Sequence, residues 1–551
     1  MKTIINIKEN AGRLIQFMLI GFLMAACSLD IEETDSKLTE GTSAIFNGIP
    51  SAEVSGTLDN IYNDIRGQTE SQENLYSLTE VSTDELLVPT RGTDWGDNGI
   101  WRTVHVHTWG PTHNHIVNVW NEKNSAVLRC SQIIDPLTTA TAAQKAEAKF
   151  ARAYNMWIVM DFWGQVPFRN PSDGPDVVPS VMTRAEAYAM IVTDLNEAIA
   201  GLPAGAPTST NKTRPTKATA RFLLAKVKLN TNVYLGAYGA GDLAEVISLV
   251  DAIQADGYGL VGNYFEIFKG QNVSNIDVIW NVTASTGNRM WNGLHYNQGH
   301  PGNAGGGWNG FSTLAEFYNK FEGPSATNTI GGAQEERRGY THTLASTTDP
   351  NPPPGSPEGT LGGNGGFGYG FQLGQMYGWG DIDYDEPGTA IGPRPIRARS
   401  GAGLIFTKEF PGLVGNTDVT GMRLLKYSPA NGAFASGVVM ARFADAHLMR
   451  AEARLRGGVG GAAQALTEVN ALRALRAQTS QLTGPMTEAI MLDERGRELY
   501  TEGWRRNDMI RFGVFKAAKE FKPAGDGHTD LFPIPSSALL SNPGLVQNPG
   551  Y

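Results

Sequence analysis

Cysteine is nearly absent from this chain. Only Cys27 and Cys130 occur among 551 residues, which excludes a disulfide-stapled scaffold and any zinc site built from several thiolates. Charged residues are also sparse at 18%, while apolar residues reach 41%. This composition excludes a charge-rich, apolar-poor disordered polymer. The chain is therefore expected to be globular, and its length predicts more than one packing unit.

Positive charge is in deficit as well. The chain has 45 Lys and Arg against 55 Asp and Glu, a formal net charge of −10. Nucleic acid and anionic lipid headgroups are therefore poor partners on electrostatic grounds. Glycine is in excess, with 65 residues against a usual share of about 7%, and this excess predicts extensive loops.

Long apolar runs are missing except near the N-terminus. A basic start is followed by residues 14–26, in which only Gln16 is strongly polar. At about 1.5 Å per helical residue this run is too short for the roughly 30 Å hydrocarbon core of a bilayer. A cleaved signal peptide over residues 1–26 is therefore predicted rather than a permanent membrane helix.

The apolar run ends in Ala25, Ala26 and Cys27, and small residues before a cysteine resemble a bacterial lipobox. The resemblance implies cleavage in front of Cys27 and acylation of its sulfur, with palmitate among the acyl groups, so that lipid anchors the protein. The acidic stretch 28–33 resembles the surface-export signal of Bacteroidetes lipoproteins. An ordinary secretory signal cut after Ala26 is the alternative.

Apolar residues with helical spacing occupy both ends of the mature chain. Ala146, Phe150, Tyr154 and Trp157 recur at steps of four, four and three, the period of one helical face. The same reasoning predicts helices over residues 51–66, 117–134, 143–163, 184–200, 218–229, 242–254, 444–455, 462–476 and 487–502. Short helices joined by turns favour stacked helical hairpins.

The middle of the chain, residues 257–436, loses this periodicity except for a short predicted helix over 312–321. Loops are expected to dominate there. In the last predicted helix, Asp493 and Arg497 are spaced for an i,i+4 ion pair.

Three blocks near the C-terminus are distinctive: RFADAHLMRAEA at 442–453, DERGRELYTEGWRRND at 493–508, and LFPIP at 531–535 leading to QNPGY at 547–551. Their order and spacing resemble the SusD/RagB family of outer-membrane nutrient-binding lipoproteins. Residues 148–167 resemble the family's first strong helical hairpin. With the lipobox, the similarity covers nearly the whole chain.

The resemblance implies a mostly α fold, in which tetratricopeptide-like helical hairpins form an α-α superhelix and a loop-rich irregular region packs on it. It implies a helical region over 27–256, a loop-rich insertion with the glycan site over 257–436, and a C-terminal helical region over 437–551. The implied task is to bind oligosaccharides or polysaccharides at the cell surface, without chemistry or a cofactor. A TonB-dependent SusC-like transporter in the outer membrane is the implied partner.

Oligosaccharides have apolar C–H faces and hydroxyl edges, so a site for them needs aromatic platforms with amide, carboxylate or guanidinium groups nearby. Two glycine-rich loop segments offer such groups, and the family's N-terminal loop and the middle of its chain contribute to the glycan site. The predicted ligand contacts are Trp95, Asn98, Trp291, Tyr296 and Trp308, with Tyr377 and Trp379 as further candidates. The alternative is that these rings fasten the loops to the scaffold, as is expected for Trp101.

Two clusters raise the question of a metal. His105, His107, His113 and His115 lie close together, but their neighbours fit the family's ordinary sequence, so no zinc site is predicted. Asp381, Asp383, Asp385 and Glu386 lie in a glycine-flanked loop that suits calcium better than zinc. The EF-hand spacing is absent, and a solvated acidic loop is the alternative to calcium.

A buried charge network, rather than a catalytic set, is the interpretation of Trp504, Arg505, Arg506 and Asp508.

A glycosidase would need two carboxylates about 5–10 Å apart across a sugar-binding cleft, and no nucleophile or acid motif is recognised. The sequence therefore favours a binding protein over its alternatives, a glycosidase-type surface enzyme or a peptide- or protein-binding helical-repeat receptor.

Overall fold

The computed structural model describes residues 46–551 except 175, 269–273, 283–287, 299–305, 348–367, 384–387, 389 and 428–436. The predicted signal peptide and Cys27 lie outside the described residues, as do Asp385 and Glu386 of the acidic loop. Residues 47–171 and 178–551 form one unit, and the fold below is the fold of this unit. Of the other unit, residues 1–46 and 172–177, only Phe46 and a turn around 172–174 with residues 176 and 177 are described.

Helices build most of the unit, and the predicted mostly helical fold is confirmed. The long helices are α2 (Ser51–Glu70), α5 (Asn114–Ile134), α6 (Ala142–Trp163), α7 (Arg184–Gly201), α8 (Lys217–Leu229), α10 (Asp242–Ala255), α13 (Phe443–Leu455), α14 (Gly461–Arg473) and α15 (Glu488–Leu499). The short ones are α3 (Asn74–Tyr76), π-helix η1 (Ser77–Val81), α4 (Ile100–Val106), α9 (Thr231–Leu235), α11 (Asn288–Trp291), α12 (Ala315–Tyr318), α16 (Arg505–Arg511) and α17 (Ser536–Ser541). Single 3-10 turns are η2 (Asp97–Gly99), η3 (Tyr264–Phe268), η4 (Glu336–Arg338), η5 (Leu344–Ser346) and η6 (His528–Asp530).

Local capping fixes where several of these helices begin and end. Helix α6 starts after Thr141, whose side chain accepts a hydrogen bond from the Gln144 amide while the Gln144 side chain binds the Thr141 backbone. Thr183 and Glu186 form the same reciprocal cap at α7. Such boxes satisfy amides that a helix start leaves without partners. Helix α6 ends at Gly164, whose φ of 72° favours glycine.

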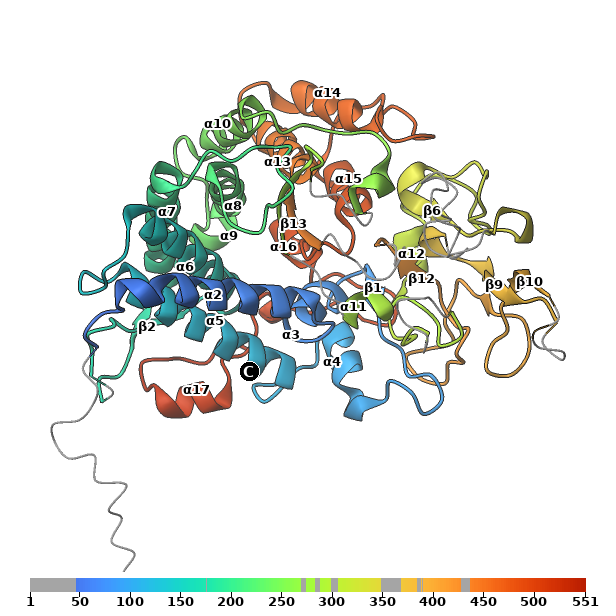
Figure 1. Ribbon diagram of the computed structural model, residues 1–551, viewed down its shortest axis with the longest axis horizontal. Helices are drawn as coiled ribbons and strands as arrows, with labels where there is room; N and C mark the ends of the chain where they lie inside the picture. Colours follow the sequence, from blue (N-terminus) through green and yellow to red (C-terminus); the bar gives the residue numbers. More distant parts are fainter. Residues whose placement is uncertain are drawn as a thin grey trace, which may run out of the picture. The chain divides into compact units, whose positions relative to one another are not determined.

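Neighbouring helices pack in a row. Helix α5 packs on α6, α6 on α7, α7 on α8, α8 on α10, α10 on α13 and α13 on α14. Figure 1 shows this row curving from α5 to α14, the arrangement expected of stacked hairpins. Helix α6 lies between two neighbours, and every residue from 150 to 163 is buried. Among the helices in the described part of the chain, none is both long and apolar enough to span a bilayer.

Short antiparallel strands, which the sequence did not predict, pair segments between the helices, and most of them involve the loop-rich region. The pairs are β1 (Leu86–Leu87) with β5 (Ser312–Thr313), β2 (Val166–Phe168) with β3 (Ser180–Met182), β4 (Val278–Val282) with β13 (Val438–Arg442), β8 (Gly374–Gln375) with β11 (Ile405–Phe406), and β9 (Tyr377–Asp381) with β10 (Ile391–Pro395). A three-stranded sheet has the order β12 (Arg423–Leu425), β7 (Tyr369–Gln372), β6 (Gly339–Tyr340). Strands of two to five residues are too short to leave a clear period-two signal.

The start of the helix predicted over 312–321 is wrong. Residues Ser312 and Thr313 form strand β5, and Leu314 is extended before the one-turn helix α12 begins at Ala315. Ser312 and Thr313 are extended because they pair with β1, which lies more than two hundred residues away in the sequence. A local sequence pattern cannot indicate so distant a partner.

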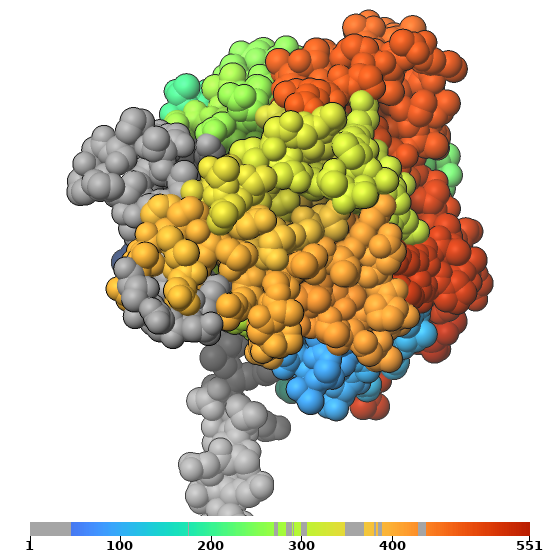
Figure 2. All heavy atoms as spheres, turned by 90° about the vertical axis from the view of Figure 1, so that its right-hand side faces the viewer, coloured from blue at the N-terminus to red at the C-terminus, as the bar shows by residue number. Residues whose placement is uncertain are grey.

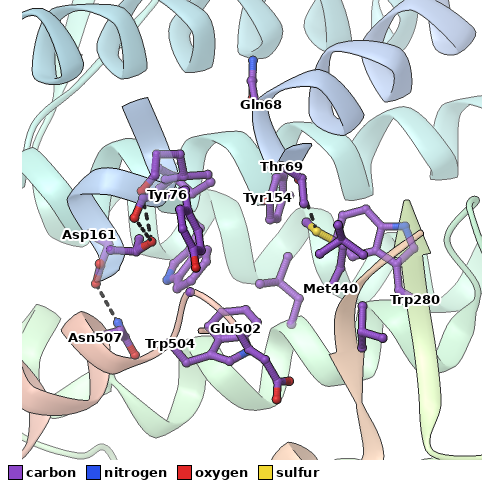
Figure 3. Close-up of a pocket in the computed structure, with 18 of the residues that line it drawn as sticks. Gln68, Thr69, Tyr76, Tyr154, Asp161, Trp280, Met440, Glu502, Trp504 and Asn507 are labelled. Carbon is purple, nitrogen blue, oxygen red and sulfur yellow. Dashed lines mark hydrogen bonds between the residues drawn. The ribbon is translucent and has the colours of Figure 1, made fainter. Parts of the chain in front are cut away.

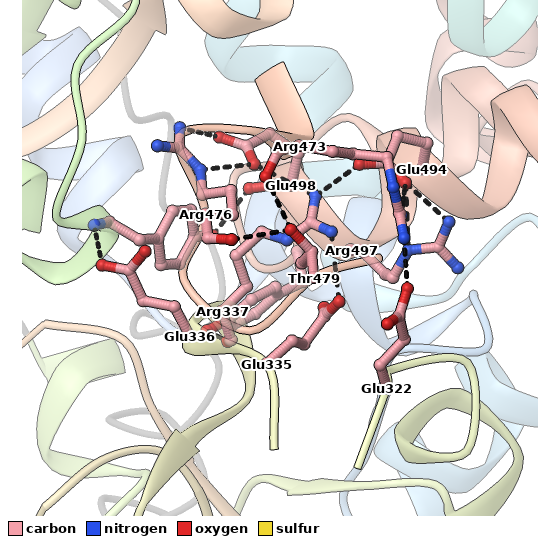
Figure 4. A network of polar contacts seen from close by, with 12 residues as sticks. Glu322, Glu335, Glu336, Arg337, Arg473, Arg476, Thr479, Glu494, Arg497 and Glu498 are labelled. Atoms are coloured by element: carbon pink, nitrogen blue, oxygen red, sulfur yellow. Dashed lines mark hydrogen bonds and ion pairs between the residues drawn. The ribbon is translucent and has the colours of Figure 1, made fainter. Parts of the chain in front are cut away.

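A buried ion-pair network ties the loop-rich region to the C-terminal helices (Figure 4). Glu498 of α15 accepts hydrogen bonds from Arg476 at 2.7 Å and from Arg442, at the end of β13, at 2.8 Å. Arg337 of η4 binds Glu494 at 2.7 Å and Glu498 at 3.3 Å. Burial alone would raise the pKa of Glu498, but these guanidinium groups outweigh it and hold that pKa well below its ordinary value.

The predicted Asp493–Arg497 pair is wrong. Asp493 binds Lys320 at 2.8 Å, and Arg497 turns to Glu494, three residues away, at 2.6 Å. Because Lys320 comes from a distant part of the sequence, spacing on α15 gave no sign of it.

Replacing Glu498 by Gln is expected to lower the free energy of unfolding by about 3–5 kcal/mol, because buried guanidinium groups are left without a compensating charge. Urea denaturation followed by circular dichroism measures the loss. Glu488→Gln is the matched control on the same helix. Glu488 binds Arg456 at 3.3 Å with 57% of its side chain exposed, so its loss should stay within about 1 kcal/mol. Equal losses in the two variants would contradict the importance of the network.

Candidate functional site

The pairing of β1 with β5 brings two distant loops together. Leu86 lies opposite Thr313 and Leu87 opposite Ser312 in an antiparallel register. In such a pair the chain that leaves one strand runs beside the chain that enters the other. The loop after Leu87 therefore meets the loop before Ser312, and Trp95 donates a hydrogen bond from Nε1 to the carbonyl oxygen of Trp308 at 2.9 Å.

The first loop has an unusual backbone. Trp95, Asp97 and Asn98 have φ angles of 60°, 37° and 51°, in the left-handed region that L-residues rarely adopt, least of all bulky ones. Such conformations persist where the surroundings impose them, and they gather at binding sites. One of those surroundings is Gly310, where a side chain would collide with the Trp95 ring at 2.7 Å.

Two buried arginines hold these loops in place. Arg91 donates to the carbonyl oxygens of Asn309 at 3.0 Å and Thr417 at 3.1 Å. Arg423 donates to the Asn309 side chain at 2.6 Å and to the Asp418 carbonyl at 2.7 Å. Burial lowers the pKa of Arg91 to about 9. Each guanidinium offers five donors in a rigid plane, which allows one side chain to join several loops.

These loops carry an ion pair, the ring of Tyr296 and the neighbouring residues Trp95 and Trp308. The Trp308 side chain is 39% exposed, and Trp95 and Tyr296 are half-buried. Tyr296 donates its hydroxyl to Asp94 at 2.9 Å. Arg399 binds the same Asp94 oxygen at 2.7 Å and lies over the Tyr296 ring, 3.6 Å from its centroid. Figure 2 shows the blue segment near residue 95 beside the orange segment near residue 400 on one face.

The polar groups of this site have fixed hydrogen-bonding roles. Burial, helped by Asp94, raises the pKa of Tyr296 to about 12, so its hydroxyl keeps its proton at neutral pH. Behind the rings, His295 binds Asp418 at 3.2 Å, and burial lowers the pKa of His295 to about 4. Arg399 and Asp94 stay open to solvent, with 53% and 34% of their side chains exposed. Both keep part of their hydrogen-bonding capacity for a ligand.

The structure gathers three of the five predicted contacts, Trp95, Tyr296 and Trp308. Asn98 is exposed in the same loop as Trp95. Trp291 differs from expectation because its side chain is only 3% exposed. Its carbonyl oxygen accepts a hydrogen bond from the Trp308 amide at 3.1 Å, so Trp291 supports the second loop instead of offering a ring to solvent.

Sequence reasoning missed the ion pair of this site. Asp94 stands next to Trp95, and its position in the Asp- and Asn-rich loop was a usable signal. Arg399 follows strand β10, about three hundred residues away, and nothing in its local sequence indicates the contact. Tyr377 and Trp379, the further candidates, lie on β9 opposite Pro395 and Pro393 of β10.

The clustered histidines bind separate backbone and hydroxyl groups. The pairs are His105 with Glu520 O at 2.8 Å, His107 with Ser82 O at 2.7 Å, His113 with Ile100 O at 3.2 Å and His115 with Ser77 Oγ at 2.9 Å. Burial lowers the pKa of His105 and His115 to about 3. Within the described ranges, no group of three or more His, Cys, Asp or Glu side chains is placed to hold a metal ion.

The buried charge network interpreted around residues 504–508 is confirmed. Arg505 binds both oxygens of Asp84 at 2.7 Å. Asp508 accepts from Arg495 at 2.8 Å and from Arg511 at 2.7 Å. These side chains join the C-terminal helices to the segment before β1, and they lie away from solvent.

Two family profiles match the sequence. Residues 415–551 match the SusD family, and residues 32–229 match a family described as starch-binding, associating with the outer membrane. The chain is 26% identical over 529 residues to the starch-binding protein SusD of Bacteroides thetaiotaomicron, covering 89% of this chain and 88% of that protein.

Solved structures share the fold. A SusD-like protein of Bacteroides fragilis superposes with a TM-score of 0.66 at 17% identity, covering 92% of this chain and 98% of that one. Surface glycan-binding protein A of Bacteroides thetaiotaomicron, in complex with laminarihexaose, superposes with a TM-score of 0.60 at 18% identity, covering 91% and 100%. These superpositions show the shared fold, and the two matched profiles, which together span more than half of the chain, show that it belongs to the SusD/RagB family.

Proposed function

We propose that this protein binds glycans through the group formed by Trp95, Tyr296 and Trp308 with Asp94 and Arg399, which we call the ring site. The observation that carries the proposal is that loops with three accessible or half-buried rings also hold an open ion pair, Tyr296 being bonded to Asp94 and Trp95 to the Trp308 backbone. The apolar faces of sugar rings stack on aromatic side chains, and sugar hydroxyls donate to a carboxylate or accept from a guanidinium. Relatives whose names record binding of starch or laminarihexaose support it.

The ring site suits a neutral glycan better than an acidic one. Asp94 already binds Arg399 at 2.7 Å, so the positive charge that would attract a uronate is matched within the site. The negative net charge of the chain opposes a polyanion as well.

Binding without cleavage is the activity that this arrangement supports. A glycosidase needs one carboxylic acid free to donate a proton and a second carboxylate across the sugar. In the ring site Asp94 accepts from Tyr296 and from Arg399. Both donors bind the same oxygen, Oδ2, and no second carboxylate belongs to the ring site.

We also propose that the protein is anchored at the outer membrane through a lipid on Cys27 and passes its glycan to a SusC-like TonB-dependent transporter. The lipobox-like sequence before Cys27 supports the anchor, and the name of the family matched at 32–229 supports the location. The transporter is implied by membership of the SusD/RagB family.

Mature protein is expected to migrate more slowly in native gels that contain a neutral glucan such as starch or laminarin, without releasing reducing sugar. Trp308→Ala should weaken the binding at least tenfold, about 1.4 kcal/mol, because an exposed anchoring ring is lost. Trp95→Ala combined with Trp308→Ala should weaken it further.

Leu540→Ala is the matched surface control. Leu540 is 88% exposed on α17, which Figure 1 shows at the lower left, away from β12 at the right. Unchanged retardation in the double tryptophan variant, with circular dichroism unaltered, would remove these rings from the site. Release of sugar would favour the glycosidase, and retention of peptides in place of glycans would favour the receptor for non-sugar nutrients.

Cys27→Ala is expected to release the protein from the membrane fraction, because the acylated sulfur is the proposed anchor. Cell fractionation followed by immunoblotting checks this outcome, and Cys130→Ala is the control because Cys130 is buried in α5. Membrane retention of Cys27→Ala would contradict the lipid anchor without bearing on the ring site.

A further inference from the structure

An aromatic cavity lies inside the helical scaffold, apart from the ring site. Its volume is about 90 Å³, and its walls come from α2, α6, α8, the β4–β13 pair and the segment 502–507 (Figure 3). We call it the inner cavity. Of the described residues, none that belongs to the ring site lines it.

The walls of the inner cavity are rings that hold one another in place. Trp504 packs against Trp157 with ring centroids 6.1 Å apart and against Phe222 at 5.9 Å. Trp280 meets Tyr154 edge to face at 5.4 Å. Except for the half-buried Trp504, these side chains are at most 5% exposed. The walls are therefore preformed, and a ligand does not have to order them.

One end of the cavity is polar. Figure 3 shows Asp161 and Asn507 there, with Trp280 and Met440 at the other end. Asp161 accepts from Asn507 at 2.9 Å and from Tyr234 at 2.8 Å, so its Oδ1 is already satisfied. The Arg506 side chain also lines the cavity, and its Nη1 is 3.6 Å from Asp161 Oδ2.

The buried guanidinium of Arg506 has N–H donors that make no hydrogen bond. The residue is 1% exposed, and neither Nε nor Nη1 has a hydrogen-bond partner, although Nη2 donates to the Asp530 carbonyl at 2.8 Å. Buried donors are almost always satisfied, by protein, water or ligand. Because Asp161 balances the charge of Arg506, the missing partner is expected to be a neutral acceptor.

The volume of the inner cavity and the polarity of its lining limit the kind of molecule that it can hold. A water needs about 10–15 Å³ of such space, and an apolar cavity of about 150 Å³ holds benzene. The volume of the inner cavity lies between these two values and below that of the benzene-holding cavity, so its occupant is at most one compact planar ring. A sugar would need several hydrogen-bond partners, whereas most lining side chains are apolar and Asp161 and Asn507 already bind each other.

We propose that the inner cavity is a second binding site, for a small, neutral, planar aromatic molecule that carries one oxygen acceptor. The ring lies among Trp157, Trp280 and Trp504, and the oxygen accepts a hydrogen bond from Arg506. This site is independent of glycan binding.

Phenol is the probe, with benzene as the analogue that lacks the oxygen. Saturation-transfer NMR and isothermal titration on the mature protein are expected to show phenol binding at least tenfold more tightly than benzene. Leu223→Phe, which adds a ring from α8 to the cavity wall, should weaken phenol binding at least tenfold. Leu223→Met, which conserves volume, should bind as the native protein does.

Val439→Ile on β13 is a second filling variant, for the case that Leu223→Phe fails to fold. Native gels with glucan should show both filling variants retarded like the native protein, and Trp308→Ala should keep phenol binding. Absence of phenol binding would overturn the proposal, and so would equal binding by Leu223→Phe and Leu223→Met or loss of binding in Trp308→Ala. Equal affinities for phenol and benzene would overturn the role of Arg506.

Discussion

Guanidinium groups enclosed by carboxylates and carbonyl oxygens are the interaction on which the structure depends. Helix α15 carries Glu494 and Glu498 into the interior, and arginines from β13, from η4 and from the end of α14 converge on them. A buried carboxylate without such partners is costly. The helical row and the loop-rich region are therefore joined by contacts that need every partner in place, in addition to the apolar core that the two regions share.

Buried guanidinium groups also position the ring site, but their partners there are different. Arg91 and Arg423 bind loop carbonyl oxygens instead of carboxylates, and thereby fix segments that have almost no regular structure. A short strand pair sets which loops meet, and the arginines set how they lie. Rigid placement favours glycan binding, because a platform that is already ordered loses little conformational entropy when a ligand binds.

Sequence patterns predicted the parts of this protein whose causes are local. Helix α6 was predicted from the spacing of Phe150, Tyr154 and Trp157, and the Thr141–Gln144 box is a second local signal, which the prediction did not use. The side chains that complete the ring site come from far along the chain. Trp95 and Trp308 were found because glycines flank them, whereas Arg399 was missed because its partner Asp94 is brought to it only by the fold. Trp291 has a similar sequence setting, and only its burial separates it from the others.

Three of the histidines described earlier, and His447 of α13, which binds the carbonyl oxygen of Glu468 at 2.8 Å, bear on how the protein responds to pH. Burial keeps the imidazoles of His105, His115, His295 and His447 uncharged, with pKa values of about 3 or 4. Histidine is the side chain that ordinarily changes charge between pH 5 and 8. The pKa values of these four lie below that range. A fall in pH from 8 to 5 would therefore leave the charge of these four interior positions unchanged.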